Sequence, residues 1–336
     1  MSNAVAVDLI RHRPPAQFAG LTITAPPSIW LTFAASYVGA ADDTPSAPLG
    51  ELSRYLGYTA RPSKDRMAQD ASTLRAQAGT SLRMWLKPNV QLESGVRSQL
   101  ERFGVSISVG SDVRTWGVQA TSRIRNLDDS ISPFNTAAVT TMVADELTFP
   151  DPFRDESFQN PPVLPTVHGG ERYLPGRTIA HYEGTDGLSG IRLQSGERTF
   201  YLLTASEQDR LDAFLDRFSI QEWSTMKASF TPGVGRVVDG FLTNSAFAFE
   251  RVPGMSGVRL WNGAPDALVQ HGAVKVDTDR VALSAWTLFT TSQCCGDLQL
   301  DQRRQARFQF STIAPTFFVE EDATGLIRFV GYTVHP

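Results

Sequence analysis

The chain has 336 residues, of which 41% are hydrophobic and 20% charged, and its formal net charge is −4. This balance is typical of a globular protein that buries a large core, in one large domain or two. The slight negative charge argues against a surface for nucleic acid or for an anionic membrane, so we expect neither as a partner.

The first 110 residues are predicted to be mostly helical, because apolar residues recur at helical spacing over 4–10, 29–38 and 96–103. The apolar run 28–41 is too short to cross a bilayer and predicts a buried core helix. Residues 82–86 favour a strand with Trp85 half-buried. Thr44 or Ser46 can cap a further helix, whose apolar residues are Leu49, Leu52 and Leu56.

From about residue 137 the pattern changes to short strands, interrupted by a short helix over 207–214. The proline-rich stretch 160–165 is the best candidate for a loop or linker. Because helices and strands segregate along the chain, we expect an α+β fold rather than a doubly wound parallel sheet. The predicted strands cover 139–149, 190–193, 199–204, 246–251 and 258–261.

The C-terminal residues predict a hairpin that follows a long loop. An Asp-Ala-Thr-Gly turn at 322–325 separates two runs of alternating apolar and polar residues. The segment from about 279 to 307 has few helix signals, and loops longer than roughly 15 residues are usually functional or disordered. We therefore expect this loop to carry function. The alternating apolar residues are Phe308, Phe310, Phe317, Val319, Ile327 and Phe329.

Several short motifs follow one another along nearly the whole chain. Trp116, Thr121 and Ile124 match the serpin segment that enters the central sheet. Phe149 with the Pro-Phe pair at 152–153 is similar to the next motif, without its tryptophan. Each motif is weak by itself, but they occur in the order of the family. The other matching residues are Pro26, Ser28, Ile29, Gly39, Ala40, Thr44, Leu49, Leu52, Leu56, Gly57, Phe329, Gly331, Val334 and Pro336.

The resemblance implies an α+β, serpin-like fold in which N-terminal helices pack on a large central mixed sheet, with further antiparallel sheets and an exposed reactive-centre loop. It implies one domain over 1–336, helix-rich over 1–130 and sheet-rich over 131–277. The reactive-centre loop covers about 279–307, and C-terminal strands cover 308–336. The implied function is inhibition of a serine or cysteine protease: the metastable fold accepts the cleaved loop as an additional strand, which traps the protease.

Counting from Asp279 as in the family places the scissile bond at Cys294–Cys295, with Gln293 and Gly296 as neighbouring candidates. Adjacent cysteines do not easily form a low-strain disulfide, so a structural bridge is not expected. Three arginines further along the loop are alternative bait for a trypsin-like protease. They are Arg303, Arg304 and Arg307.

The hinge that follows Asp279 departs from the family pattern, which favours a glycine and then small residues. Leu283 and Trp286 are bulky, and in either register one of them points into the sheet. Overpacking costs about 1–3 kcal/mol per misfit, which favours a non-inhibitory protein or a protease substrate. The apolar and β-branched residues favour a strand nonetheless. The hinge residues are Arg280, Val281, Ala282, Leu283, Ser284, Ala285, Trp286 and Thr287.

A buried polar cluster under the central sheet is also implied by the resemblance, at Ser28, Asp145 and His271. Ala25 stands where another serine is common in the family, and Asp145 where an asparagine is common. These groups are expected to satisfy one another's hydrogen bonds in the core. A contact between Asp145 and His271 would make the cluster sensitive to pH.

No enzyme motif is present: the sequence lacks a G-x-S-x-G elbow, a P-loop, H-E-x-x-H and G-x-G-x-x-G. The five histidines have no metal-ligand spacing, so we expect no catalytic residue, metal or cofactor. Acidic pairs such as Glu320 and Glu321 are interpreted as solvated turns. A weaker alternative is a thiol redox site at Cys294 and Cys295.

The first residues do not form a signal peptide, because Asp8, Arg11 and Arg13 interrupt any apolar core. We therefore expect a cytoplasmic protein, with an extracellular location as the alternative that the family suggests. We also expect a monomer.

Overall fold

The computed structural model describes residues 2–13, 20–40, 46–110, 137–148, 171–173, 179–205, 207–233, 236–238, 241–248, 264–276, 280–292 and 315–334. The helices are α1 (Ser2–Arg11), α2 (Pro26–Val38), α3 (Ser46–Tyr55), α4 (Lys64–Ala78), α5 (Ser94–Phe103), α7 (Gln208–Arg217) and α8 (Ile220–Ala228). The strands are β1 (Gly20–Thr24), β2 (Ser81–Leu86), β3 (Ser106–Val109), β4 (Ala137–Thr148), β5 (Glu171–Tyr173), β6 (Ile179–Glu183), β7 (Leu188–Ser195), β8 (Arg198–Ala205), β9 (Thr231–Gly233), β10 (Arg236–Val238), β11 (Phe241–Ala248), β12 (Ala264–Val276), β13 (Arg280–Ser292), β14 (Thr316–Asp322) and β15 (Ile327–Val334).

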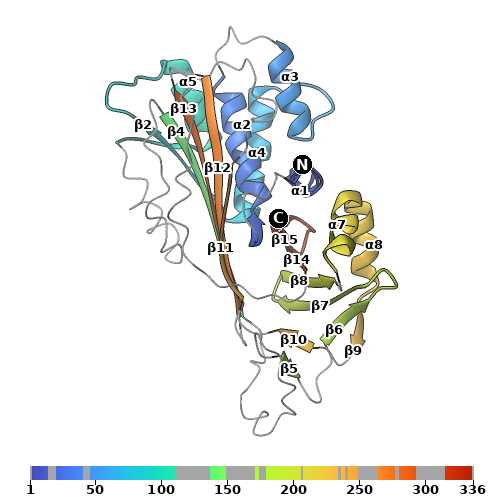
Figure 1. Cartoon of the computed structure of the whole chain (residues 1–336). Coiled ribbons are helices and arrows are strands. Elements are labelled where there is room, and N and C mark those ends of the chain that lie inside the picture. The colour runs from blue at the N-terminus through green and yellow to red at the C-terminus, as the bar shows by residue number, and fades with distance from the viewer. Residues whose placement is uncertain are drawn as a thin grey trace.

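The sheet that contains the longest strands has six strands, in the order β11-β12-β13-β4-β2-β3. Its strands pair antiparallel except β2 and β3, which are parallel, so the sheet is mixed as expected. In Figure 1 its long strands run beside α2, with α4 and α1 on the same side. The second sheet has seven antiparallel strands in the order β1-β15-β14-β8-β7-β6-β9, and β5 and β10 form a separate pair.

Helix α2 is the buried core helix that the apolar run predicted. All thirteen of its residues are buried, because the helix packs on both sheets and on its neighbouring helices. Pro26 and Pro27 occupy its first two positions, where a missing backbone N–H costs nothing. Its C-terminus is closed by the Gly39 N–H, which donates to the carbonyl of Ala35 at 2.8 Å.

Helix α4 was not predicted, because polar residues outnumber the apolar ones along it. The Ser63 hydroxyl caps its N-terminus by accepting from the Arg66 N–H at 3.1 Å. Gly79 ends it in the left-handed conformation at φ 60°. The helix could have been predicted from four apolar residues at helical spacing, all of which are buried: Met67, Ala71, Leu74 and Ala78.

The predicted C-terminal hairpin is confirmed as β14 and β15. The Asp322 carboxylate holds the turn, because its Oδ1 accepts from the N–H groups of Thr324 at 2.8 Å and Leu326 at 3.0 Å. Gly325 adopts φ 79°, a conformation that disfavours other residues. The hairpin packs on an aromatic core with α7 and α8, whose rings include Tyr201, Phe214, Phe218, Trp223, Phe230 and Phe317.

Most of the other predicted elements are confirmed with shifted ends. The predicted helices appear as α1, α2, α3, α5 and α7, and predicted strands appear as β2, β4, β7, β8 and β11. Trp85 is 4% exposed and therefore buried, not half-buried, because β2 lies inside its sheet. The predictions for residues 160–165, 258–261, Phe308 and Phe310 lie outside the described residues. In the described part of the chain, no helix is long and apolar enough to span a bilayer.

The expectation of an exposed loop from about 279 to 307 is wrong for 280–292. These residues form β13, a strand inside the six-stranded sheet, with β12 on one side and β4 on the other. The β-branched and aromatic residues of this segment favour a strand, and both of its edges find a partner. This inserted strand is the central observation for function.

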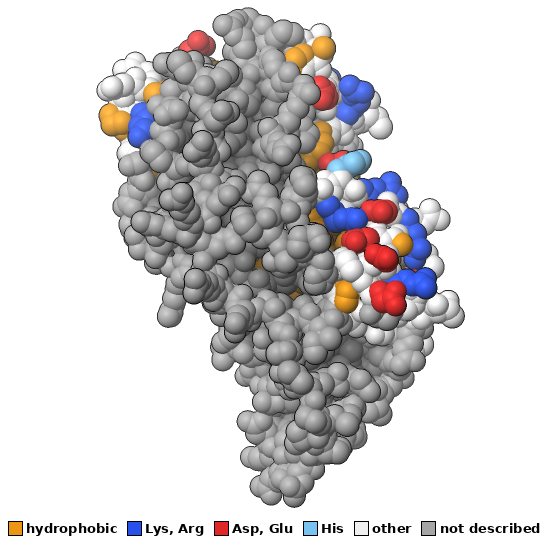
Figure 2. Space-filling view, viewed as in Figure 1, with side chains coloured by type: hydrophobic (Ala, Val, Ile, Leu, Met, Phe, Trp, Pro, Cys, Tyr) orange, Lys and Arg blue, Asp and Glu red, His pale blue; other side chains and the backbone are white. Residues whose placement is uncertain are grey.

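The described surface over α1, α7 and α8 carries positive and negative side chains side by side (Figure 2). Arg13 lies 2.7 Å from the Asp216 carboxylate, and Arg217 lies 2.7 Å from that of Glu222. This described face therefore has paired charges rather than a patch of one sign.

Candidate functional site

Strand β13 is paired along almost its whole length on both edges. Its residues 280–291 pair with 148–137 of β4, and its residues 281–292 pair with 276–264 of β12, with one irregularity near Pro265. Both pairings are antiparallel, so the backbone donors and acceptors of β13 are satisfied from two sides. The segment is thus an integral strand of the sheet in this structure.

Leu283 is the hinge residue whose side chain the structure describes, and it is 1% exposed. Its neighbours in register are Asp145 on β4 and Val274 on β12. The sheet therefore accommodates one of the two bulky residues that were expected to hinder insertion. Burying a leucine contributes about 1.5–3 kcal/mol. Trp286 pairs in register with Met142 and His271, and its side chain is outside the described part.

The predicted hinge residues Arg280, Val281, Ala282, Leu283, Ser284, Ala285, Trp286 and Thr287 all lie in β13. The strand ends at Ser292, two residues before Cys294. Other predicted site residues fall outside the described residues. They are Asp279, Gln293, Cys294, Cys295, Gly296, Arg303, Arg304 and Arg307.

Buried polar contacts join α2 to β4, on one side of β13. The Thr141 hydroxyl of β4 donates to the Ser28 carbonyl at 3.1 Å, and its Oγ1 lies 3.2 Å from Oγ1 of Thr32. All three residues are fully buried. The Ser28 hydroxyl itself has no hydrogen-bond partner among the described residues.

A second contact joins α2 to β12, on the other side of β13. The Gln270 side chain is fully buried, and its Oε1 accepts from the Ala25 N–H at 3.0 Å. Its Nε2 donates to the Ala25 carbonyl at 3.4 Å. Because Ala25 caps α2, the helix is bonded to both of the strands between which β13 lies.

The expected cluster of Ser28, Asp145 and His271 is therefore only partly placed. Ser28 is buried under the sheet, but the side chains of Asp145 and His271 lie outside the described part. Asp145 and His271 pair in register with Leu283 and Trp286, three residues apart on β13. That offset is about 10 Å along the strand, and two strand spacings add about 9.5 Å across it. The backbones of the two residues are therefore separated both along the strands and across them.

Among the described side chains, Gln270 and Thr141 make the bonds between α2 and the two strands beside β13. The sequence could have pointed to Gln270, because it directly precedes His271. Neighbouring residues of a strand point to opposite faces, so one of these two side chains must face α2. Shifting the family match at His271 by one residue would have identified Gln270. Thr141 carried no such signal, because its partners on α2 are more than 100 residues away.

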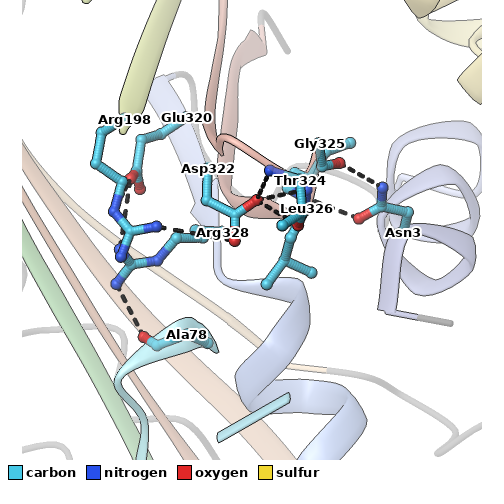
Figure 3. A network of polar contacts seen from close by, with 10 residues as sticks. Asn3, Ala78, Arg198, Glu320, Asp322, Thr324, Gly325, Leu326 and Arg328 are labelled. Carbon is cyan, nitrogen blue, oxygen red and sulfur yellow. Dashed lines mark hydrogen bonds and ion pairs between the residues drawn. The ribbon is translucent and has the colours of Figure 1, made fainter. Parts of the chain in front are cut away.

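A buried ionic cluster ties the C-terminal hairpin to the end of α4 (Figure 3). Glu320 is fully buried, and its Oε1 lies 3.8 Å from Nη1 of Arg328 and 3.9 Å from Nε of Arg198. Nη2 of Arg328 donates to the Ala78 carbonyl at 2.8 Å. Asp322 faces Arg198 at 3.8 Å, so two acids balance two arginines.

The neighbouring Glu321 is also buried, at 4% exposure. Its Oε1 accepts from Nε1 of Trp223 at 2.5 Å, and its Oε2 lies 2.7 Å from Nζ of Lys227. Burial, and secondarily the charge of Glu321, raises the pKa of Tyr201. The interpretation of Glu320 and Glu321 as a solvated turn is therefore wrong, because both lie in β14 with buried partners.

No family model matches the sequence, and no curated protein matches it. Solved structures do match, at low identity. The latent state of tengpin, a thermophilic serpin, has 12% identity and a TM-score of 0.73, covering 99% of this chain and 96% of tengpin. Loop-inserted, cleaved ovalbumin has 14% identity and a TM-score of 0.71, covering 100% of this chain and 98% of its own.

A cleaved viral serpin, CrmA, has 15% identity and a TM-score of 0.61, covering 85% of this chain and 99% of its own. The chain therefore has the serpin fold, an α+β architecture with N-terminal helices and a large sheet. The structures named are latent, cleaved or loop-inserted forms. In this chain, β13 lies between β12 and β4.

Proposed function

We propose that this chain is a protease inhibitor whose bait segment is attacked by a serine or cysteine protease. In this proposal the protease cleaves at or next to Cys294–Cys295, and the segment that begins at Arg280 enters the sheet as β13. The chain itself performs no catalysis, since the protease supplies it. The observation that carries the proposal is the position of β13, paired with β4 and β12 on both edges.

The end of β13 supports the proposed bond. The strand stops at Ser292, which precedes Cys294 by two residues in the sequence. The 23 residues 293–315 join β13 to β14, and such a connection can span at most roughly 80 Å. An uncut chain can hold β13 in the sheet only if the end of β13 and the start of β14 lie within that distance.

A second candidate is a non-inhibitory protein or substrate with the same fold, and the size of Leu283 favours it. Trapping requires that insertion is faster than hydrolysis of the acyl-enzyme. A leucine that must enter the packed interior slows insertion where a small residue would not. The slot accommodates Leu283 once insertion is complete, so the question is one of rate.

The test is incubation with a panel of serine and cysteine proteases, followed by denaturing gel electrophoresis. A complex that survives boiling supports inhibition, and alkylating the protease nucleophile should abolish it. Clean cleavage with the protease still active instead supports the substrate. Mass spectrometry of the fragments then assigns the cut among Gln293, Cys294, Cys295 and Gly296 or the alternatives Arg303, Arg304 and Arg307.

A further inference from the structure

A cavity of about 260 Å³ lies between the start of α1, the middle of α4 and the turn of the β14–β15 hairpin. This volume is just below the range of about 300–1,000 Å³ that is usual for drug-sized ligands. It therefore suits a molecule with on the order of ten non-hydrogen atoms. None of its lining residues belongs to β13, and no part of the proposed inhibitory function uses the cavity.

The walls of this cavity are fixed by hydrogen bonds before any ligand arrives. Nδ2 of Asn3 donates to the Gly325 carbonyl at 2.8 Å, and its Oδ1 accepts from the Ile327 N–H at 2.9 Å. These bonds hold the start of α1 against the hairpin turn, as Figure 3 shows. A preformed wall lowers the entropy cost of binding.

Several hydrogen-bond acceptors line the cavity, among them Ser2, Asp70 and Gly325. Ser2 is 3% exposed, and its buried hydroxyl has no hydrogen-bond partner among the described residues. Asp70 accepts from Tyr58 at 2.7 Å and from Arg66 at 3.0 Å, both on Oδ2, which leaves Oδ1 as an acceptor. The Gly325 carbonyl accepts one hydrogen bond and retains a second lone pair.

Part of the remaining lining is apolar, beside the polar residues Asn3, Thr73, Gln77 and Thr324. Leu74 is buried and Leu326 is half-buried, and both line the cavity. Asp70 is the one charged side chain among its lining residues, and its side chain is 10% exposed. Arg66 offsets part of that charge but is itself 62% exposed, so solvent screens it more than it screens Asp70.

We propose that this cavity binds the primary ammonium group of a small organic amine that also carries an apolar ring or chain. An ammonium group has three N–H donors and no acceptor, which matches the acceptors of Asp70, Ser2 and Gly325. The carboxylate supplies the compensating charge, and the two leucines contact the apolar part. The site is independent of the proposed protease inhibition.

The test is calorimetric titration of the full chain with three probes of similar shape. Phenethylammonium should bind saturably. Uncharged 2-phenylethanol and trimethyl(phenethyl)ammonium, which has the charge but no N–H donors, should each bind at least roughly ten-fold more weakly. Absence of saturable binding by phenethylammonium, or equal binding of the three probes, overturns the proposal.

Matched variants locate the binding site. Asp70→Asn should weaken phenethylammonium binding at least roughly ten-fold. Asp65→Asn, on the same helix with a side chain that is 88% exposed, should leave binding unchanged. Thr73→Phe, which fills the cavity from an exposed position, should also abolish binding with Asp70 intact. Unchanged binding in Asp70→Asn or in Thr73→Phe would overturn the assignment.

Discussion

Replacing Leu283 with glutamate should selectively destabilise the form in which β13 occupies the sheet. The substitution forfeits the burial of a leucine that is 1% exposed, worth about 1.5–3 kcal/mol. The buried glutamate must also take up a proton. At pH 7, about 2.7 pH units above the usual pKa of glutamate, protonating this side chain costs about 3.7 kcal/mol, since each unit is worth about 1.36 kcal/mol. The expected loss in the free energy of unfolding is therefore about 5–7 kcal/mol.

The assay is urea unfolding of the protein after its loop has been cut by a protease. Cut Leu283→Glu should unfold at a much lower urea concentration than the cut wild type, and Leu283→Ala should lie between them with a loss of about 2–5 kcal/mol. The matched control is Val109→Glu, in the edge strand β3 of the same sheet at 64% exposure. It should change stability by no more than about 0.5 kcal/mol.

The same variant links stability to inhibition. If insertion of β13 traps the protease, Leu283→Glu should be cleaved without forming a stable complex. The reasoning is refuted if cut Leu283→Glu and the cut wild type unfold at the same urea concentration, since Leu283 would then not be buried in the cut form.

Three further predictions concern the buried polar groups. Arg328→Met leaves the buried Glu320 without one of its arginines, with Arg198 3.9 Å away. Stability in urea should fall by about 3–5 kcal/mol. Adding Glu320→Gln should restore part of this loss, and no recovery would contradict the pairing. Gln270→Leu removes the bonds to Ala25 and should lower the free energy of unfolding by about 1–3 kcal/mol. The control Gln194→Leu, at an exposed position, should lower it by less than about 0.5 kcal/mol in the same assay. Burial raises the pKa of Tyr332 above its usual 10.0, so above pH 10 the unfolded chain releases a proton that the folded one keeps. Stability should then fall with rising pH, by at most about 1.4 kcal/mol per pH unit for this group. Tyr332→Phe should lessen the loss between urea unfolding at pH 9 and at pH 11; an identical loss in both proteins would contradict the assignment.

Local patterns were sufficient to predict the elements whose structure depends on neighbouring residues. Helix α2 followed from an uninterrupted apolar run, and the C-terminal hairpin followed from alternation around a turn that Asp322 and Gly325 hold. The serpin fold itself was predicted from weak motifs in the right order, and solved structures support it at 12–15% identity.

Features that depend on distant partners were not predicted. Strand β13 has its edge partner β4 more than 130 residues earlier, so its own sequence is compatible with both a loop and a strand. Glu320 was interpreted as solvated because its partner Arg198 is 122 residues away. Gln270 was not singled out, since only the register of the sheet brings its side chain to Ala25.

The pairing of β1 with β15 has a consequence for how the protein is made. Gly20 is paired with Val334, and Asn3 is bonded to Gly325 and Ile327, so the earliest segments of the chain are completed by very late ones. Until β15 has been translated, the edge of β1 that pairs with it stays open. Such long-range contacts form slowly and expose nascent chains to aggregation. A stop codon just before β15 therefore removes the partner of β1 as well as the strand itself, and should leave a nascent product that chaperones must hold.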